Sequence, residues 1–355
     1  MATLYVTEPR SLVRKDGDTL IVDVPADRQR GTERRSVRVP LIKVDQVVIH
    51  GDSTVTGAAL AALLEQRAEI CFLSADGRFR GRLSPEFSKN SVVRLEQYRA
   101  HDAPERAFPL ARSFVYGKLA NMRTLLLRAN RKREDDNVAA AAATLKELMD
   151  RVAALERDPS AAPPDPSAPQ AGTVEGTLMG LEGAGTAAYF GAFGRLLAGG
   201  WSFERRTKRP PTDPVNALLS YGYVLLMHQV AAAVQLVGLD PYVGYLHGAK
   251  YGKPALALDL MEEFRPIIVD SVVLTVLNNG MLQPDDFSEE FGAYRLTDKG
   301  RRIFLQKFEE RLDTEVQHPI FRYKATYRRC LELQARLLAK ALTGDIPQYR
   351  PFLVR

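Results

Sequence analysis

Short apolar and β-branched stretches separated by turn residues dominate the first 90 residues of the chain, a pattern typical of strands. Lys15-Asp16-Gly17-Asp18 supplies a hairpin turn between two of these stretches. Apolar residues at helical spacing interrupt the strands once, at about Thr56–Gln66. The expected strands are Thr3–Thr7, Ser11–Lys15, Thr19–Val24, Ser36–Val39, Gln46–His50, Ile70–Ser74 and Phe79–Leu83. We therefore expect a small, mostly β domain over residues 1–90, with one helix packed on it.

Helical periodicity takes over after Ser91. Residues 91–108 are expected to form a helical connector and residues 109–355 a larger all-α domain, so the predicted fold class is α+β. Asp213 before Pro214 combines an N-cap with a proline at the first helical position, and Thr297 marks a further helix start. The expected helices are Leu110–Ala129, Ala139–Glu156, Gly185–Leu197, Pro214–Val237, Val269–Asn278, Lys299–Asp313 and Tyr323–Thr343.

One segment of the helical part, Asp158–Gly172, contains five prolines with alanines and serines and no large apolar residue. Such a composition cannot pack a core. It would suit a domain boundary, but the helical character is the same on both sides. We therefore interpret residues 158–172 as a proline-rich insertion loop.

Composition narrows the class of protein. The chain has 355 residues, 45% of them hydrophobic, which is enough for a core and for two domains. The net charge of +6 is compatible with a nucleic-acid partner without requiring one. Cys71 and Cys330 stand outside any CxxC spacing, so a thiolate zinc site is excluded and two free, buried thiols are expected.

The first residues lack an apolar core before a small-residue cleavage site, so we expect no secretory signal. The most apolar stretch, from Ala217 to Val237, is broken by polar residues such as His228 and Gln229. This favours a buried helix over a membrane span. We expect a cytoplasmic protein with no membrane partner.

The candidate chemistry lies within Pro241–Asp270. There His247 precedes a glycine-rich turn, and an apolar run then ends in Asp259, Glu262 and Glu263. Residues three apart share a helix face, so Asp259 and Glu262 would be neighbours while Glu263 would point elsewhere. Two carboxylates that close repel unless a cation neutralises them, and an added imidazole makes a suitable site for Mg²⁺ or Mn²⁺.

A third carboxylate must come from elsewhere, and Glu182 is the best candidate. It is expected at the start of an apolar helix, where an acid suits the helix dipole, so a plain first-turn acid is an equal interpretation. From spacing alone, His247 could be a hydrogen-bonded core histidine, Asp259 a helix cap and Glu262 part of a solvated face. The histidines with at most scattered acids nearby are given no role: His50, His101 and His318.

Three blocks of sequence carry a family resemblance. They are KRPPTDPVNALLSY at 208–221, GLDPYVGYLH at 238–247 and LDLMEEFRP at 258–266. They resemble RRPPxDPVNALLSY, GLDPxxGFLH and DLMEEFRP of the CRISPR-associated spacer-acquisition integrase–endonuclease family, and the likeness covers nearly the whole chain. Lys208 and Tyr245 stand where Arg and Phe are common, and the proline-rich loop is not associated with the core of that family.

The resemblance implies a metal site. The family binds its metal with a glutamate, a histidine and a further acid, which fall here on Glu182, His247 and Glu262. Asp259 matches another acidic position, as an auxiliary ligand or a group beside the ligands. Because the family often has Asp where Glu262 stands, the choice between Asp259 and Glu262 as the direct ligand stays open. The cofactor would be Mg²⁺ or Mn²⁺.

The resemblance also implies phosphoryl transfer on double-stranded DNA. The 3′-hydroxyl of a prespacer attacks a phosphodiester of the CRISPR repeat, which is the adaptation step of antiviral defence, and the helical domain is then catalytic. Basic side chains would contact phosphates: Lys250, Arg265, Arg205, Arg206, Lys208 and Arg209. The alternatives are a solvated Lys250, an Arg265 that pairs with Glu262 or Asp259, and an ordinary solvated face for the remaining charge run.

Members of that family form a homodimer through the N-terminal domain, and two dimers flank a small ferredoxin-like partner dimer in a heterohexamer. A further adaptation nuclease is another implied partner. The competing functions are a non-catalytic DNA-binding scaffold, a hydrolase of small phosphoesters and a purely structural assembly protein. The complete set of acids argues against the first, and the basic runs and the lack of an HxH or HxxxH pair argue against the second. The third role is compatible with catalysis.

Overall fold

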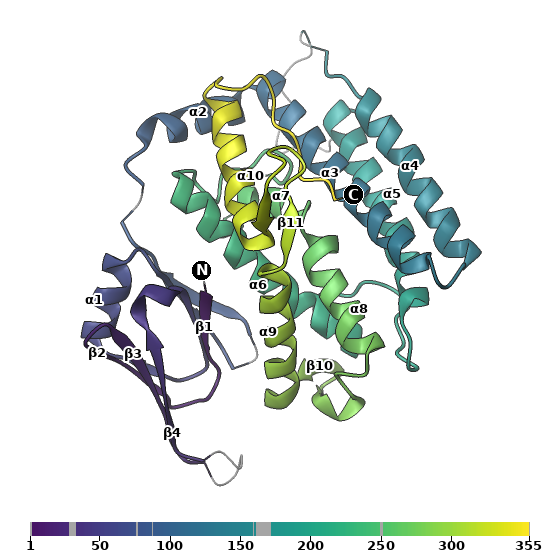
Figure 1. Ribbon diagram of the computed structural model, residues 1–355. Helices are drawn as coiled ribbons and strands as arrows, with labels where there is room; N and C mark the ends of the chain where they lie inside the picture. Colours follow the sequence, from purple (N-terminus) through teal and green to yellow (C-terminus); the bar gives the residue numbers. More distant parts are fainter. Residues whose placement is uncertain are drawn as a thin grey trace. The chain divides into compact units, whose positions relative to one another are not determined.

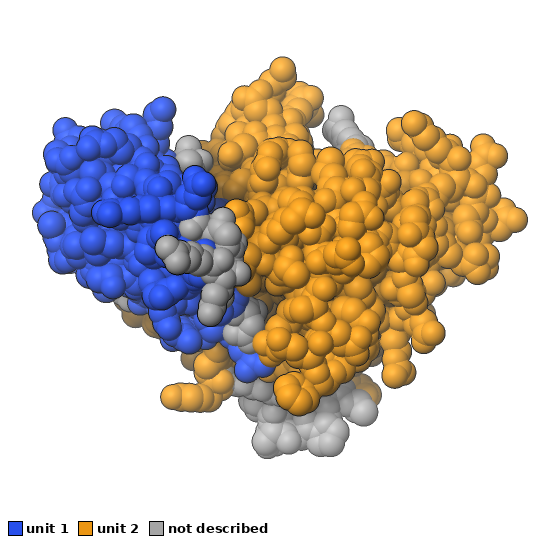
Figure 2. All heavy atoms as spheres, turned by 90° about the horizontal axis from the view of Figure 1, so that it is seen from below, with its two compact units in different colours: residues 1–87 blue, residues 88–355 orange. Residues whose placement is uncertain are grey.

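The chain divides into two compact units, residues 1–87 and 88–355 (Figures 1 and 2). The computed structural model describes residues 2–27, 33–75, 77–86, 88–158, 160, 172–248 and 251–354. Most of the proline-rich loop expected at 158–172 therefore lies outside the described residues, as does Lys250. The segment expected as a connector, 91–108, belongs to the second unit.

The first unit contains two four-stranded sheets. The first sheet has the order β1-β5-β7-β8, with the first three strands parallel and the last antiparallel. The second has the order β4-β3-β2-β6, with only the β2–β6 pair parallel. The elements are β1 (Ala2–Val6), β2 (Leu12–Asp16), β3 (Thr19–Val24), β4 (Arg35–Pro40), a 3₁₀ turn (Leu41–Lys43), β5 (Val44–His50), β6 (Thr54–Val55), α1 (Gly57–Glu65), β7 (Glu69–Leu73) and β8 (Phe79–Leu83).

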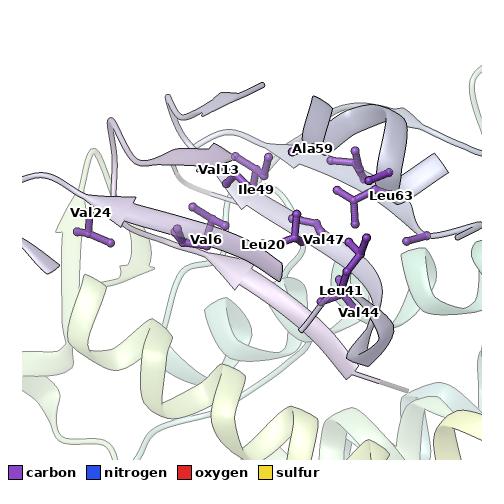
Figure 3. Close-up of a cluster of buried hydrophobic side chains, with 14 residues drawn as sticks. Val6, Val13, Leu20, Val24, Leu41, Val44, Val47, Ile49, Ala59 and Leu63 are labelled. Atoms are coloured by element: carbon purple, nitrogen blue, oxygen red, sulfur yellow. The ribbon is translucent and has the colours of Figure 1, made fainter. Parts of the chain in front are cut away.

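The core of this unit draws on both sheets and on the helix (Figure 3). Val13 and Leu20 come from one sheet, Val47 and Ile49 from the other, and Leu63 from α1, and each is at most 1% exposed. Alternation along each strand places these side chains on the inner faces. The expectation of a small, mostly β domain with one packed helix is confirmed. The strand that periodicity missed, β6, is only two residues long.

The second unit is mostly helical (Figure 1). Its helices are α2 (Ser91–Asp102), α3 (Pro104–Asn130), α4 (Asp136–Ala154), α5 (Val174–Phe193), α6 (Pro214–Val237), α7 (Ala255–Met261), α8 (Ser271–Asn278), α9 (Asp298–Leu312) and α10 (Tyr327–Leu342). Short turns of helix lie at Gly194–Leu196, Pro266–Asp270 and Pro284–Asp286. Two hairpins, absent from the expectation, pair β9 (Phe287–Glu290) with β10 (Ala293–Leu296) and β11 (Glu315–Gln317) with β12 (Lys324–Thr326).

Side-chain caps start several of these helices where the sequence predicts them. Asp213 accepts a hydrogen bond from the N–H of Asn216 at 2.7 Å, and Thr297 accepts one from Gly300 at 3.2 Å. Each cap satisfies a donor that the first turn would otherwise leave unpaired. Cys71 and Cys330 are free and buried, as expected, and burial raises the pKa of each thiol to about 12.

Helix α6 is the one described helix long and apolar enough to cross a membrane by length and composition. In the fold, 56% of its most apolar window is buried, and the helix packs against α7 and α10. That burial is typical of a core helix, as the polar residues within the stretch predict.

Gly222, on α6, has no room for a side chain. A Cβ atom there would lie 2.5 Å from Cγ1 of Val269 and 3.0 Å from Cζ of Phe304, which is fully buried. We expect Gly222→Ala to lower the free energy of unfolding by about 1–3 kcal/mol, the usual cost of overpacking. Denaturant titration of the variant and the parent protein measures the difference.

The matched control is Gly180→Ala at an exposed position of α5, where a Cβ would meet nothing within 4 Å. Here the better helix propensity of alanine should stabilise the protein by about 0.5–1 kcal/mol. Equal effects of the two substitutions would contradict the packing argument.

Candidate metal centre

The carboxylate of Asp259, on α7, is completely buried and organises the loop before it. It accepts three backbone N–H groups from residues 245–247, at 2.6 to 3.0 Å. It also lies 2.6 Å from Nδ1 of His247. With Nδ1 engaged in this way, the imidazole presents Nε2 as its remaining nitrogen.

Helix α2 holds the same loop from its other side. Gln97, fully buried, donates to the carbonyls of Asp240 and Val243, both at 2.8 Å, and accepts the N–H of Asp240 at 2.7 Å. Nδ1 of His101 lies 2.7 Å from the carbonyl oxygen of Gly244. His101, which has no role in the sequence analysis, therefore contacts the loop that carries His247.

Gly244 is required by this close packing. A Cβ there would lie 2.6 Å from Oδ2 of Asp259 and 2.8 Å from the backbone of Ala255. Any side chain would push the loop away from α7 and break the hydrogen bonds that orient His247.

Glu182 lies in the middle of α5 and not at a helix start. The helix begins at Val174 and is capped by Thr173, whose side chain accepts from the N–H of Gly176 at 3.0 Å. The interpretation of Glu182 as a first-turn acid is therefore wrong. Oε1 of Glu182 accepts a hydrogen bond from Thr186, one turn further along, at 3.0 Å.

Lys118, on α3, joins the acids of two other elements. Its side chain is only 3% exposed, and its ammonium forms ion pairs with Oε1 of Glu182 and with Oε2 of Glu262, the latter at 2.9 Å. The structure thus brings Glu182 and Glu262 to one buried cation, although 80 residues of sequence separate them.

Glu262 ends α7 and is 2% exposed. Its Oε1 lies 2.7 Å from Nη1 of Arg265 and 3.8 Å from Nε2 of His247. Burial by itself raises the pKa of Glu262, but the charges of Arg265 and Lys118 outweigh it and lower the pKa to about 2. The carboxylate is therefore ionised at neutral pH, as a metal ligand must be.

The residues suit a divalent cation by their chemistry. Two carboxylates and an imidazole are ligands that Mg²⁺ and Mn²⁺ accept. Oε2 of Glu262 is buried and has no aligned hydrogen bond, although the ammonium of Lys118 is close. Among the described residues, no three His, Cys, Asp or Glu side chains already surround a common point. The ammonium of Lys118 instead pairs with both Glu182 and Glu262.

Glu263 points away from these groups, which confirms the expectation from helix geometry. It accepts hydrogen bonds from the hydroxyl of Tyr349 and the N–H of Phe352, both at 2.7 Å, and from Gln334 at 3.2 Å. Burial raises its pKa to about 8, and these donors act in the opposite direction. Glu263 anchors the C-terminal segment behind the site.

The basic residues at 205–209, within and just before the first sequence block, lie in different environments. Arg205, Lys208 and Arg209 are exposed. The guanidinium of Arg206 faces inward: it donates to Asn216 at 2.8 Å and to Ser220 at 3.0 Å. Burial lowers its pKa.

Lys208 and Arg265 border the acids. Partial burial lowers the pKa of Lys208, the charges of Arg265 and Arg206 lower this pKa further, and the charge of Glu262 raises it. These effects locate the lysine near the site. Arg265 pairs with Glu262, and its guanidinium carbon lies 5.1 Å from the ring centroid of Tyr223. The ion pair with Glu262 is the alternative that the sequence analysis gave for this arginine.

A family model, CRISPR associated protein Cas1, matches residues 4–310. The chain belongs to the Cas1 family. A Cas4 exonuclease/Cas1 endonuclease fusion of Geobacter sulfurreducens is 42% identical over 99% of this chain, which spans only 60% of that relative. A protein of Rhodospirillum rubrum named CRISPR-associated endonuclease Cas1 2 is 38% identical over 99% of this chain and 97% of its own length.

Solved structures of Cas1 proteins have the same fold. A Cas1 protein from Thermotoga maritima superposes with a TM-score of 0.76 at 23% identity, over 97% of both chains. A chain of a Cas6-RT-Cas1–Cas2 complex superposes with a TM-score of 0.73 at 26% identity, over all of this chain and 36% of that one. The expected order of a strand-rich region followed by a larger helical one is thus that of known Cas1 proteins.

Sequence reasoning missed three residues around this candidate site: Lys118, Gln97 and His101. Each belongs to the helices α2 and α3 and meets partners more than 60 positions away. No local pattern distinguishes them from solvated or core residues. Only the packing of α3 on α5 and α7 reveals what Lys118 contacts.

Asp259 offers a direct test of the loop geometry. In Asp259→Asn an amide N–H₂ would replace one acceptor oxygen and face backbone donors. We expect the free energy of unfolding to fall by about 1–3 kcal/mol, because buried donors lose their partner. Denaturant unfolding measures this.

Asp240→Asn is the matched control in the same loop. Asp240 is only half-buried and accepts one backbone N–H, that of Tyr242 at 2.8 Å. Its substitution should cost less than about 1 kcal/mol. An Asp259→Asn protein as stable as the parent would show that the carboxylate does not hold the loop.

Proposed function

We propose that this Cas1 protein is a metal-dependent DNA endonuclease and integrase of CRISPR adaptation. In the proposed reaction, the 3′-hydroxyl of spacer DNA attacks a phosphodiester of the repeat. A new bond forms between that oxygen and phosphorus, and the bond to the repeat's own 3′-oxygen breaks. The observation that carries the proposal is the convergence of Glu182, His247 and Glu262, from two helices and a loop, in a protein of the Cas1 family.

Glu182, His247 and Glu262 would hold Mg²⁺ or Mn²⁺. A bound cation of this kind polarises a phosphodiester and stabilises the negative charge that develops on it. Asp259 keeps Nε2 of His247 directed toward Glu262 and uses its own oxygens on the loop. We therefore assign Glu262 as the direct ligand and Asp259 as the residue that positions His247.

The exposed cations Arg205, Lys208 and Arg209 are proposed to contact DNA phosphates. Arg265 is proposed to steady Glu262 and to face the same phosphates. Arg206 is not proposed as a DNA contact, because its guanidinium donates hydrogen bonds to Asn216 and Ser220. Lys250, outside the described residues, stays a prediction.

The partners are also proposals. Similarity to a Cas4–Cas1 fusion and to a chain of a Cas6-RT-Cas1–Cas2 complex supports an adaptation nuclease and a second adaptation protein as partners. By family likeness we propose a homodimer through the first unit and a heterohexamer with a small ferredoxin-like dimer. The substrates would be prespacer and CRISPR-repeat duplexes.

Strand transfer tests the function. The protein, with and without the small partner, is mixed with a labelled duplex that has free 3′-hydroxyl ends and a supercoiled plasmid that carries a leader and repeat. We expect joining with Mg²⁺ or Mn²⁺ and none with EDTA. His247→Ala and Glu262→Ala should each lower the rate at least about a hundredfold, since each removes a proposed ligand.

Glu147→Gln, an exposed acid on α4, is the control and should join DNA like the parent. A wild-type protein that binds DNA but joins nothing with any metal would sink the integrase proposal. The non-catalytic scaffold would then be the better description.

Salt dependence tests the proposed DNA contacts. Replacing Arg205, Lys208 and Arg209 by alanine one at a time should weaken duplex binding. Each lost phosphate contact should reduce the slope of log K against log salt by about 0.9. Fluorescence anisotropy over a range of salt concentrations measures the slopes.

Lys146 is exposed on α4 and paired with Asp150, so Lys146→Ala removes the same charge from another surface. Its slope should equal that of the parent. If all four variants shift the slope alike, the effect is one of net charge, and the proposed contacts are wrong.

A further inference from the structure

The two carboxylates proposed as metal ligands already have side-chain cations. The ammonium of Lys118 pairs with Glu182 and lies 2.9 Å from Oε2 of Glu262. Arg265 lies 2.7 Å from the other oxygen of Glu262. Two negative charges are therefore matched by two positive charges before any metal binds. A dication that enters this group meets repulsion from both cations at short range, inside the protein where screening by water is weak.

We infer that Lys118 competes internally with the divalent cation, so that metal and DNA phosphate bind this site cooperatively. The inference rests on the proposed metal-dependent function and adds a rule for how the site is loaded. With a dication bound, the charges of Lys118, Arg265 and the metal together exceed those of the two carboxylates. A phosphodiester brings negative charge that offsets this positive excess. Because binding linkage is reciprocal, DNA should strengthen metal binding by the factor by which metal strengthens DNA binding.

The surroundings of Lys118 favour competition over withdrawal of its helix. At the preceding residue, Gly117, a Cβ would lie 2.7 Å from Cβ of Pro351. One turn after Lys118, Asn121 donates to the carbonyls of Glu263 and Phe352, at 2.8 and 2.7 Å. The C-terminal segment thus fixes α3 from behind. A metal ion would therefore displace the side chain of Lys118 and not its helix.

The acceptor that a metal ion would take over is also identifiable. Oε2 of Glu262 is buried without an aligned hydrogen bond, although Lys118 stands beside it. Its capacity to bind a cation is therefore only partly used. The exposed Lys208 interacts electrostatically with Arg265, Glu262 and Lys118, which puts a phosphate-attracting cation close to the same group.

Lys118→Met tests the competition, since methionine keeps much of the length and removes the charge. The probe is Mn²⁺ alone, and free Mn²⁺ is followed by electron paramagnetic resonance in the absence of DNA. We expect weak binding by the parent and binding about tenfold tighter, or more, by Lys118→Met, because one nearby repulsive charge is gone. Lys146→Met, which removes an exposed lysine on α4, should bind Mn²⁺ like the parent.

A folded Lys118→Met protein that binds Mn²⁺ no better than the parent would overturn the inference. Circular dichroism and the unfolding midpoint establish that the variant is folded. If it is not, a second measurement on the unmodified chain decides.

That measurement repeats the Mn²⁺ titration of the parent protein with a short duplex that has 3′-hydroxyl ends. We expect DNA to tighten Mn²⁺ binding about tenfold or more, as a typical linkage between two sites. Titrations of DNA alone, and of Glu262→Gln with DNA, subtract the Mn²⁺ that DNA itself holds. Equal Mn²⁺ affinity with and without the duplex would overturn the coupling.

These readouts separate the inference from the proposed function. If no strand joins under any metal but Lys118→Met still tightens Mn²⁺ binding, the proposed reaction fails and the role of Lys118 stands. If joining depends on His247 and Glu262, but Mn²⁺ affinity changes neither in Lys118→Met nor when DNA is added, the function stands and the inference fails.

Discussion

The hydrogen bonds of the buried carboxylate of Asp259 are the constraint on which the rest of the site depends. Burial of a carboxylate is costly unless its oxygens are matched by donors. Here three backbone N–H groups and the ring of His247 supply them. If residues 245–247 lay elsewhere, the carboxylate of Asp259 would be buried without these donors. The position of the loop and the burial of Asp259 therefore require each other. Gln97 and His101 fix the other edge of the loop, and His247 has little freedom left.

The same principle governs the neighbouring group in a looser form. Glu262 is as deeply buried as Asp259, but its partners are the charged side chains of Lys118 and Arg265 and not backbone N–H groups. Backbone donors in a packed loop cannot be exchanged for a metal ion, whereas an ammonium on a flexible stem can move. Asp259 is therefore suited to hold geometry, and Glu262 is suited to exchange one cation for another. This difference is the reason to assign them separate roles although they lie three residues apart.

How far the sequence predicts this arrangement depends on how local each feature is. The strands of the first unit and most helices follow from periodicity within a few residues, and Asp213 and Thr297 mark their helix starts correctly. Helix α5 begins earlier than expected. The sequence hides this start, because glycines at 176, 180 and 183 weaken the apolar pattern of the helix and its cap, Thr173, follows a proline-rich stretch. Lys118 could not be found at all. A single lysine in a long helix becomes informative only when α3 is packed against α5 and α7.

The basic run at 205–209 shows how the fold divides a cluster that looks uniform in the sequence. Asn216, buried on α6, accepts the N–H of Thr207 at 2.9 Å and donates to the carbonyl of Arg205 at 2.9 Å. It thereby folds the run back onto its own helix. Arg206 is turned inward to Asn216, and Lys208 is left exposed close to Glu262. The family block is thus partly scaffold, since its Asn216 and the preceding Arg206 hold each other, while the neighbouring Lys208 is left exposed.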